Sequence, residues 1–293
     1  MATISCGGTK ERFKFIHLNK KVGVVKLCDW LKVSRSGYYT WKNRAVSERV
    51  VDDAVLTRKI KAIHSLSDGV YGSPRVHAAL HKQGINVARK RVERLMRDAG
   101  LKGQLVLVTS KQPKIKSFFL SKSNLLLNAS KPEKIDQIWV ADVTYLKVAG
   151  KWQYLATVMD QYSRRILGWS LGAARSSVLT SNALAYAMKK RGYPKNAILH
   201  TDRGSEYLSY SFQTYVKKWR MKHSVNRPEH CTVNAFMESF FHSMKAELFR
   251  GRKFDSIIEL RKSVSDYINN FYNDRLHSGL NYCSPVEFEA MAG

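Results

Sequence analysis

The chain has 293 residues, of which 44% are hydrophobic, and this is enough for two or three small domains with apolar cores. Its formal net charge of +27 at pH 7 is extreme for this length, and most of the excess lies before residue 135. Such a charge favours nucleic acid as a partner, although ribosomal and membrane-surface proteins share it. The 4 cysteines are scattered without a Cys-x-x-Cys pair, which argues against a disulfide framework or a zinc ribbon.

The sequence also argues against export and membrane insertion. Its first residues lack the apolar segment of a signal peptide. No apolar run approaches the ~20 residues that cross a bilayer. We therefore expect a soluble, cytoplasmic protein, and the charge suggests association with the nucleoid.

Residues 1–64 are predicted to form a helical region of the helix-turn-helix type. One helix is expected from Val22 to Leu31, followed by a Ser-Arg-Ser-Gly turn and a second, aromatic-rich helix. Ser34 is a suitable N-cap for that second helix. A further helix is expected over residues 47–64.

Residues 65–100 are predicted to form a basic helix-turn-helix module. Pro74 suits a first helical turn, and an apolar stripe follows it as far as Gly84. The second helix buries a stripe of its own and carries a basic face, formed by Arg89, Lys90, Arg91, Arg94 and Arg97. This face suits a DNA groove, and the alternative is a solvated face of a small helical bundle. His77 and His81 have metal-ligand spacing, but we interpret them as an ordinary helix face.

A basic linker over residues 101–135 separates this module from a region with a different periodicity. Strands are expected over 138–148, 152–160, 165–171, 197–201 and 222–225, with helices over 176–191, 209–219, 234–249 and 255–272. Three meandering strands followed by alternating helices and strands predict an α/β fold over residues 136–293, with a mixed five-stranded sheet flanked by helices.

Two carboxylates interrupt or end the predicted buried strands. Asp142 lies within the first strand, and Asp202 ends the fourth. If the strands are neighbours, the two carboxylates meet at one edge and repel each other unless a cation lies between them. Oxygen ligands of this kind suit Mg²⁺ or Mn²⁺.

The helix over 234–249 is expected to supply a third carboxylate. Glu238, His242 and Lys245 fall on one face of this helix, at positions i, i+4 and i+7. Acid, imidazole and amine on one face suit a metal beside a phosphate backbone. For Glu238 alone a solvated position would be the better interpretation, but together with Asp142 and Asp202 the metal-binding role is favoured.

In this arrangement the chain resembles a known family over nearly its whole length. Asp142, Asp202 and Glu238 match the Asp-Asp-Glu triad of retroviral-integrase-like transposases, and the chain looks most like the second-frame (OrfB) transposases of the bacterial insertion sequence three family. SRSGYYTW at 34–41, YGSPRVHAAL at 71–80 and RVERLMR at 91–97 resemble the N-terminal modules of that family. WVADVTYL at 139–146, VMDQYSRRILGW at 158–169, HTDRGSEY at 200–207, NAFMESFFHSMKAE at 234–247 and YNDRLHSGLNYCSPVEF at 272–288 resemble its catalytic core and tail.

The resemblance implies an RNase-H-like core with two divalent ions, Mg²⁺ or Mn²⁺, held by the triad. The ions would serve an in-line displacement at phosphorus, in which the ends of an insertion sequence are nicked and 3′-hydroxyl ends are joined to DNA. The implied partners are double-stranded DNA (terminal inverted repeats and target), other copies of the chain on that DNA, and the product of an overlapping upstream frame. Gly204 would let the chain turn after Asp202 without crowding a metal.

Some residues depart from the family pattern. Val233 replaces an aspartate before the glutamate helix, where Thr232 could substitute as a cap, and Glu206 stands where the family often has glutamine. A catalytically impaired relic or a DNA-binding regulator therefore remains an alternative function, and a nuclease of the same fold is a third.

Other acidic residues compete for the metal site. Asp160 also ends a strand, and the arginines that follow it offer a structural pairing instead. We interpret Asp136, Glu229 and Glu247 as solvated.

Overall fold

The structure of the chain is a computed structural model that describes residues 8–43, 47–104, 124–126, 131–226, 235–249 and 252–292. The chain divides into two compact units, Met1–Lys59 and Ile60–Gly293. Among the described residues, no helix combines the length and the apolar character that a membrane crossing requires.

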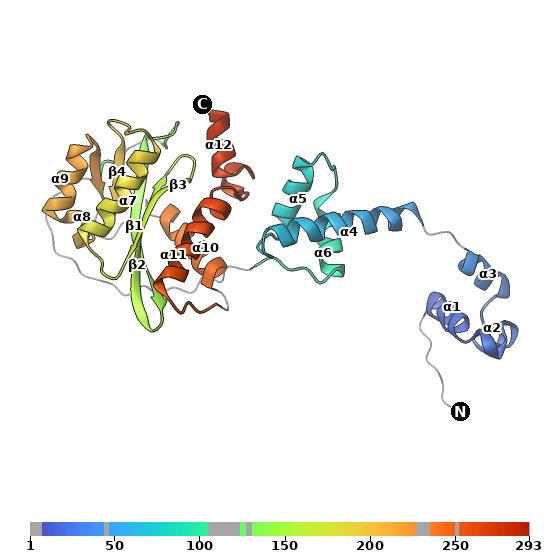
Figure 1. Cartoon of the computed structure of the whole chain (residues 1–293). Helices are drawn as coiled ribbons and strands as arrows, with labels where there is room; N and C mark the ends of the chain where they lie inside the picture. Colours follow the sequence, from blue (N-terminus) through green and yellow to red (C-terminus); the bar gives the residue numbers. More distant parts are fainter. Residues whose placement is uncertain are drawn as a thin grey trace. The chain divides into compact units, whose positions relative to one another are not determined.

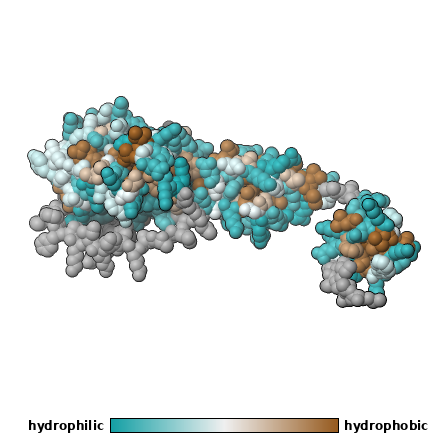
Figure 2. All heavy atoms as spheres, turned by 60° about the horizontal axis from the view of Figure 1, so that its bottom comes forward, coloured by the Kyte–Doolittle hydropathy of each residue, from teal (hydrophilic) through white to brown (hydrophobic). Residues whose placement is uncertain are grey.

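The first unit is a small helical cluster. It contains α1 (Thr9–Leu18), α2 (Val24–Trp30) and α3 (Arg35–Asn43), followed by the first turns of α4 (Glu48–Leu66). Its core is formed by Phe13, Ile16, Leu27, Cys28 and Tyr38. The Ser34 hydroxyl accepts a hydrogen bond from the Gly37 N–H at 3.2 Å, as the predicted N-cap requires. Apolar side chains also reach the surface of this unit (Figure 2), among them Leu18 and Trp30.

A basic pair of helices opens the described part of the second unit after α4. α5 (Ser73–Lys82) begins with Pro74 in its first turn, and Gly84 turns the chain with a φ of 74° before α6 (Arg89–Asp98). The apolar stripes of both helices are buried, as predicted, and comprise Val76, Leu80, Val92, Leu95 and Met96. The predicted helix-turn-helix geometry is therefore present.

The rest of the second unit is built on a mixed five-stranded sheet with the order β3-β2-β1-β4-β5. Its strands are β1 (Ile138–Val148), β2 (Lys151–Asp160), β3 (Ile166–Gly172), β4 (Ile198–Thr201) and β5 (Lys222–Val225). β1, β2 and β3 pair antiparallel, whereas β4 and β5 run parallel to β1. The hairpin turn between β1 and β2 has positive φ at Ala149 (45°) and Gly150 (79°), which matches the twist of the flanking strands. The predicted fold class is confirmed.

Helices cover both faces of the sheet (Figure 1). α7 (Ser177–Lys190), the short α8 (Ser205–Leu208) and α9 (Tyr210–Lys218) lie on one side and share a core with Trp139 and Leu199. α10 (Ala235–Phe249) and α11 (Ile257–Asp266) lie on the other and pack on Val140 and Leu155. Because the sheet is buried on both faces, its strands read as nearly continuous apolar runs.

The predicted helix over 255–272 differs in its last turns. α11 ends at Asp266 and continues as a π-helical segment (Tyr267–Tyr272), before the final helix α12 (Pro285–Ala292). Directly after the π-helical segment, the Asn273 side-chain amide accepts a hydrogen bond from the Ile166 N–H at 2.9 Å and donates one to the Ile166 carbonyl at 3.2 Å. This side chain therefore joins the C-terminal helices to β3.

Candidate active site

Asp142 and Asp202 are brought together by the parallel pairing of β1 and β4. Ala141 lies opposite Thr201 in this pair, so the next residue of each strand is an aspartate. The Asp202 carboxylate accepts a hydrogen bond from the Gly204 N–H at 2.9 Å. The expectation that the two acidic strands are neighbours is confirmed.

The two aspartates interact electrostatically. Burial and the nearby Asp202 carboxylate raise the pKa of Asp142 to about 8. A raised pKa means that the charged form of the pair is unfavourable without added positive charge. A pair of carboxylates in this state is a suitable donor set for a hard divalent cation.

An arginine that the sequence did not reveal lies beside this pair. The Arg175 Nε donates to the buried Glu206 at 2.7 Å, and its Nη2 lies 3.4 Å from the Asp202 carboxylate. Burial alone would lower the pKa of Arg175, but Glu206 and Asp202 raise it above the ordinary value. Arg175 follows β3 in a loop without periodicity, so no sequence signal pointed to it.

The ion pair between Arg175 and Glu206 explains why residue 204 is a glycine. A Cβ at residue 204 would lie 2.2 Å from the Glu206 Oε1 and 2.8 Å from the Arg175 Nη2. The φ of Gly204 is −58°, which any residue can adopt. Glycine is therefore needed for the close approach of Arg175 and Glu206, rather than for the turn that the sequence suggested.

The three predicted residues of α10 lie at different depths. Glu238 is exposed in the first turn, and His242 is half-buried. The Lys245 Nζ lies 4.5 Å from the centroid of the Tyr145 ring on β1. Burial lowers the pKa of Lys245, and Asp142 raises it by a smaller amount, so this ammonium lies within electrostatic reach of Asp142. Among the described residues, no three His, Cys, Asp or Glu side chains are close enough to hold a metal together.

Asp160, the other candidate metal ligand, is held by hydrogen bonds from the backbone. It is fully buried, and its carboxylate accepts from the backbone N–H groups of Asp136 (2.7 Å), Tyr162 (2.9 Å) and Ser163 (3.0 Å). Backbone donors, rather than the following arginines, satisfy it, because the chain curls around the end of β2.

Two of the acids predicted to be solvated are in fact paired. Glu247 forms an ion pair with Arg275, and the exposed fractions of the two side chains are only 4% and 3%. Asp136 lies 3.2 Å from the Arg191 Nε and accepts from the Trp139 indole. The arginines that pair with these acids, Arg275 and Arg191, lie far from them in the sequence, so the local sequence pattern could not reveal the pairs. Glu229, Thr232 and Val233 lie outside the described residues.

The basic face of α6 is accessible. Arg89 pairs with Glu93 at 2.9 Å and Arg94 with Asp98 at 3.3 Å, both as exposed i,i+4 pairs. Lys90 and Arg97 are exposed, and Arg91 is half-buried. The buried residues of α6 are those of its apolar stripe, and all five predicted basic residues lie outside this stripe.

Comparisons with known proteins agree with this architecture. Two models of the integrase core domain match residues 132–231 and 238–292, and a model of an HTH-like domain matches residues 51–106. The catalytic core domain of the HTLV-2 integrase in complex with magnesium is 20% identical, over 54% of this chain and 98% of that chain, with a TM-score of 0.43.

Curated relatives extend over nearly the whole chain. The InsF transposase of insertion sequence IS3A from Escherichia coli (strain K12) is 33% identical over 94% of this chain and 98% of its own length. A transposase of insertion sequence element IS904 from Lactococcus lactis is 34% identical over 84% of this chain and 98% of its own length. The chain therefore belongs to the IS3 family of insertion-sequence transposases, with an HTH-like domain followed by an integrase core domain.

Proposed function

We propose that this transposase nicks the ends of an insertion sequence and joins the resulting 3′-hydroxyl ends to DNA by metal-dependent phosphoryl transfer. The observation that carries the proposal is the neighbouring position of Asp142, within β1, and Asp202, directly after the paired strand β4. Glu238, on the helix that packs beside β1, is the third proposed catalytic residue.

Asp142, Asp202 and Glu238 would hold two divalent cations, Mg²⁺ or Mn²⁺. The raised pKa of Asp142 supports this assignment, because the acid pair favours additional positive charge. When bound, such ions activate the attacking hydroxyl and stabilise the leaving oxygen. In the chain itself, Arg175 pairs with Glu206 at 2.7 Å and lies 3.4 Å from the Asp202 carboxylate, so its single positive charge offsets only part of their combined negative charge.

Double-stranded DNA is the proposed partner of the N-terminal modules. Residues 65–100 would contact the terminal repeats through the basic face of α6, and residues 1–64 would extend this contact. His242 and Lys245 would contact the phosphate backbone near the site of chemistry. Several copies of the chain would assemble on the DNA. The product of the overlapping upstream frame would be a further member of this assembly.

The test is incubation of the whole chain with labelled element ends and Mg²⁺ or Mn²⁺. Asp142→Asn, Asp202→Asn and Glu238→Gln should each reduce nicking by orders of magnitude while DNA binding is retained, because metal stabilisation contributes several kcal/mol. Asp160→Asn is the matched control and should lower stability instead, since an amide cannot accept all three backbone donors. Near-normal nicking by any of the three variants would remove that residue from the triad.

A second function is favoured by one observation. Arg175 already supplies a positive charge to Asp202 and Glu206, where the proposed ions would bind. A chain in which this ion pair replaced the metal would be a catalytically impaired transposase or a DNA-binding regulator. Such a chain would bind element ends but would produce no 3′-end nick with either cation.

A further inference from the structure

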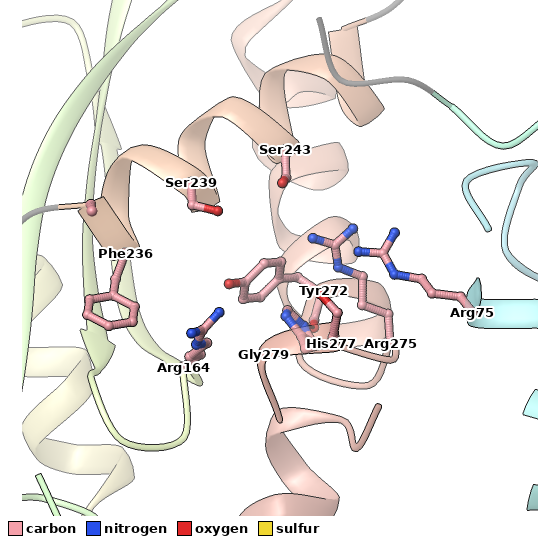
Figure 3. Close-up of a pocket in the computed structure, with 11 residues that line it drawn as sticks. Arg75, Arg164, Phe236, Ser239, Ser243, Tyr272, Arg275, His277 and Gly279 are labelled. Atoms are coloured by element: carbon pink, nitrogen blue, oxygen red, sulfur yellow. Dashed lines mark hydrogen bonds between the residues drawn. The ribbon is translucent and has the colours of Figure 1, made fainter. Parts of the chain in front are cut away.

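A cavity of about 310 Å³ lies beside α10, the helix that carries Glu238 (Figure 3). Its walls come from α5, the loop between β2 and β3, α10 and the segment that follows α11. We call it the arginine pocket, because Arg75, Arg164 and Arg275 line it together with other polar residues, among them Ser239, Ser243 and Tyr272.

The arginine pocket holds more positive than negative charge. Arg275 is neutralised by the buried Glu247. Within the described residues, neither Arg75 nor Arg164 forms an ion pair with a carboxylate. Instead, Arg75 stacks over the Tyr71 ring at 5.8 Å and Arg164 over the Phe236 ring at 5.0 Å. In the described part of the chain, three guanidinium groups thus line one cavity with a single ion-paired carboxylate, Glu247, which contacts Arg275 and acts on Arg75 only through space.

The electrostatics of neighbouring groups reflect this excess. Burial and the charge of Arg275 lower the pKa of Arg75. Burial, with Arg275, Arg75 and Arg164, lowers the pKa of His277 to about 3, so this imidazole adds no charge at neutral pH. A bound anion would relieve the repulsion between the arginines.

The remaining donors suit an oxyanion. Ser239 and Ser243 are one helical turn apart, and both hydroxyls point toward the cavity from α10 (Figure 3). Buried Arg275 has its Nε without a hydrogen-bond acceptor among the described residues. Guanidinium groups with neutral hydroxyl donors are a typical arrangement for binding phosphate.

A glycine fixes the position of one of these arginines. A Cβ at Gly279 would lie 2.5 Å from the Arg164 Nη1, so the guanidinium rests directly on the glycine backbone. Any side chain at this position must displace Arg164. Gly279→Ala therefore changes the pocket without changing its formal charge.

We propose that the arginine pocket binds a phosphate group, and that this phosphate belongs to the DNA backbone beside the bond that is cut. The position supports this source, because Ser239 directly follows Glu238 on α10. The inference rests on the proposed function for its choice of DNA. A free phosphate or pyrophosphate offers the same chemistry and is the alternative source.

The experiment measures binding of the full-length chain to a duplex carrying the element's terminal repeat, over a range of salt concentrations and without divalent ions. Arg164→Gln and Arg75→Gln should each weaken binding and reduce the salt slope by about 1, the effect of one lost phosphate contact. Gly279→Ala should also weaken binding, although it removes no charge. Lys189→Gln is the control, because it removes one exposed positive charge on α7, away from the pocket.

A second arm measures thermal stabilisation of the wild-type chain and of Arg164→Gln by pyrophosphate. Stabilisation of the wild type alone, with an unchanged DNA salt slope, would support the phosphate site and identify a free anion as its ligand. If the pocket variants match Lys189→Gln in DNA binding and pyrophosphate stabilises both proteins equally, the inference is overturned. Nicking is not measured here, so a catalytically inactive chain still tests the pocket.

Discussion

The Lys245 ammonium lies over the face of the Tyr145 ring, 4.5 Å from its centroid. This cation–π contact joins α10 to β1, the strand that also carries Asp142. The sequence left open whether Lys245 is an ordinary helix lysine paired with an acid. Within the described residues its contact is instead a cation–π interaction on the same strand as Asp142. This position leaves the positive charge available to DNA near the proposed catalytic residues.

Lys245→Glu should reduce strand joining by roughly tenfold or more while the protein stays folded, because it places a negative charge beside DNA. Lys245→Arg should be tolerated better, since an arginine keeps the charge and stacks on Tyr145. Strand joining with pre-nicked ends measures both. Lys253→Glu is the control, because Lys253 is exposed and lies beyond the end of α10. Equal losses from the two glutamate variants would mean that only overall charge matters.

The Arg175–Glu206 pair leads to a prediction about metal requirement. Arg175 lies 3.4 Å from the Asp202 carboxylate and would therefore compete with a cation bound by this proposed ligand. The double variant Arg175→Gln, Glu206→Gln removes this competitor together with its buried partner, so neither member of that ion pair is left charged without the other. We expect half-maximal nicking at a several-fold lower Mg²⁺ concentration.

Single variants separate this effect from folding. Arg175→Gln alone leaves the 3%-exposed Glu206 without its partner and should lower the free energy of unfolding by roughly 3 kcal/mol. Glu206→Gln alone leaves Arg175 free to pair with Asp202 and should raise the Mg²⁺ requirement. An unchanged requirement in the double variant would show that Arg175 does not compete with the ion.

The basic face of α6 gives a third prediction. Replacing Arg89, Lys90, Arg91 and Arg94 with alanine should weaken binding to element ends, and each lost phosphate contact should reduce the salt slope by about 1. The exposed pairs of Arg89 with Glu93 and of Arg94 with Asp98 contribute little stability, so DNA can replace the acids. Glu93→Gln is the complementary variant and should strengthen binding. An unchanged slope in the alanine variant would show that α6 faces solvent or protein.

The parts of the fold that depend on local periodicity could be predicted from the sequence. The first three strands were recognisable because each contains an apolar run, and the turn residues Ala149 and Gly150 separate the first two. Asp142 stood out because an acid within such a run requires a partner. That its strand neighbours the strand of Asp202 was an inference from this shared requirement, and it is confirmed, whereas the parallel direction of the pair is seen only in the structure.

The features that depend on distant contacts could not be predicted in this way. Glu247 has the spacing of a solvated helix residue, yet Arg275 from beyond α11 covers it. Arg175 lies in a loop, and its role depends on how β3, β4 and α8 converge. The arginine pocket likewise combines residues as far apart in sequence as Arg75 and Arg275, and no local pattern marks them as neighbours.

The last prediction concerns Glu289 on α12, which joins the C-terminal helix to the sheet. Its carboxylate accepts from the Ser163 hydroxyl at 2.6 Å and from Arg165 at 2.5 Å, and it also pairs with Arg191. Burial would raise the pKa of Glu289, but these donors lower it below its ordinary value of 4.5. Because the pKa of Glu289 is lower in the folded state, its ionised carboxylate stabilises the folded protein at pH values above the unfolded-state pKa. This stability is lost as the pH falls through the folded-state pKa.

Glu289→Gln should therefore lower the free energy of unfolding at pH 7 by roughly 3 kcal/mol, because it removes the carboxylate that pairs with Arg165 and Arg191, and among the described residues only Arg191 keeps a second acid, Asp136. It should also reduce the loss of stability between pH 5 and more acidic conditions, which urea unfolding at several pH values measures. Glu287→Gln is the matched control on the same helix. Its ion pair with Lys82 is exposed, so we expect a change within about 1 kcal/mol. Equal effects of the two variants would contradict a structural role for the buried Glu289 cluster.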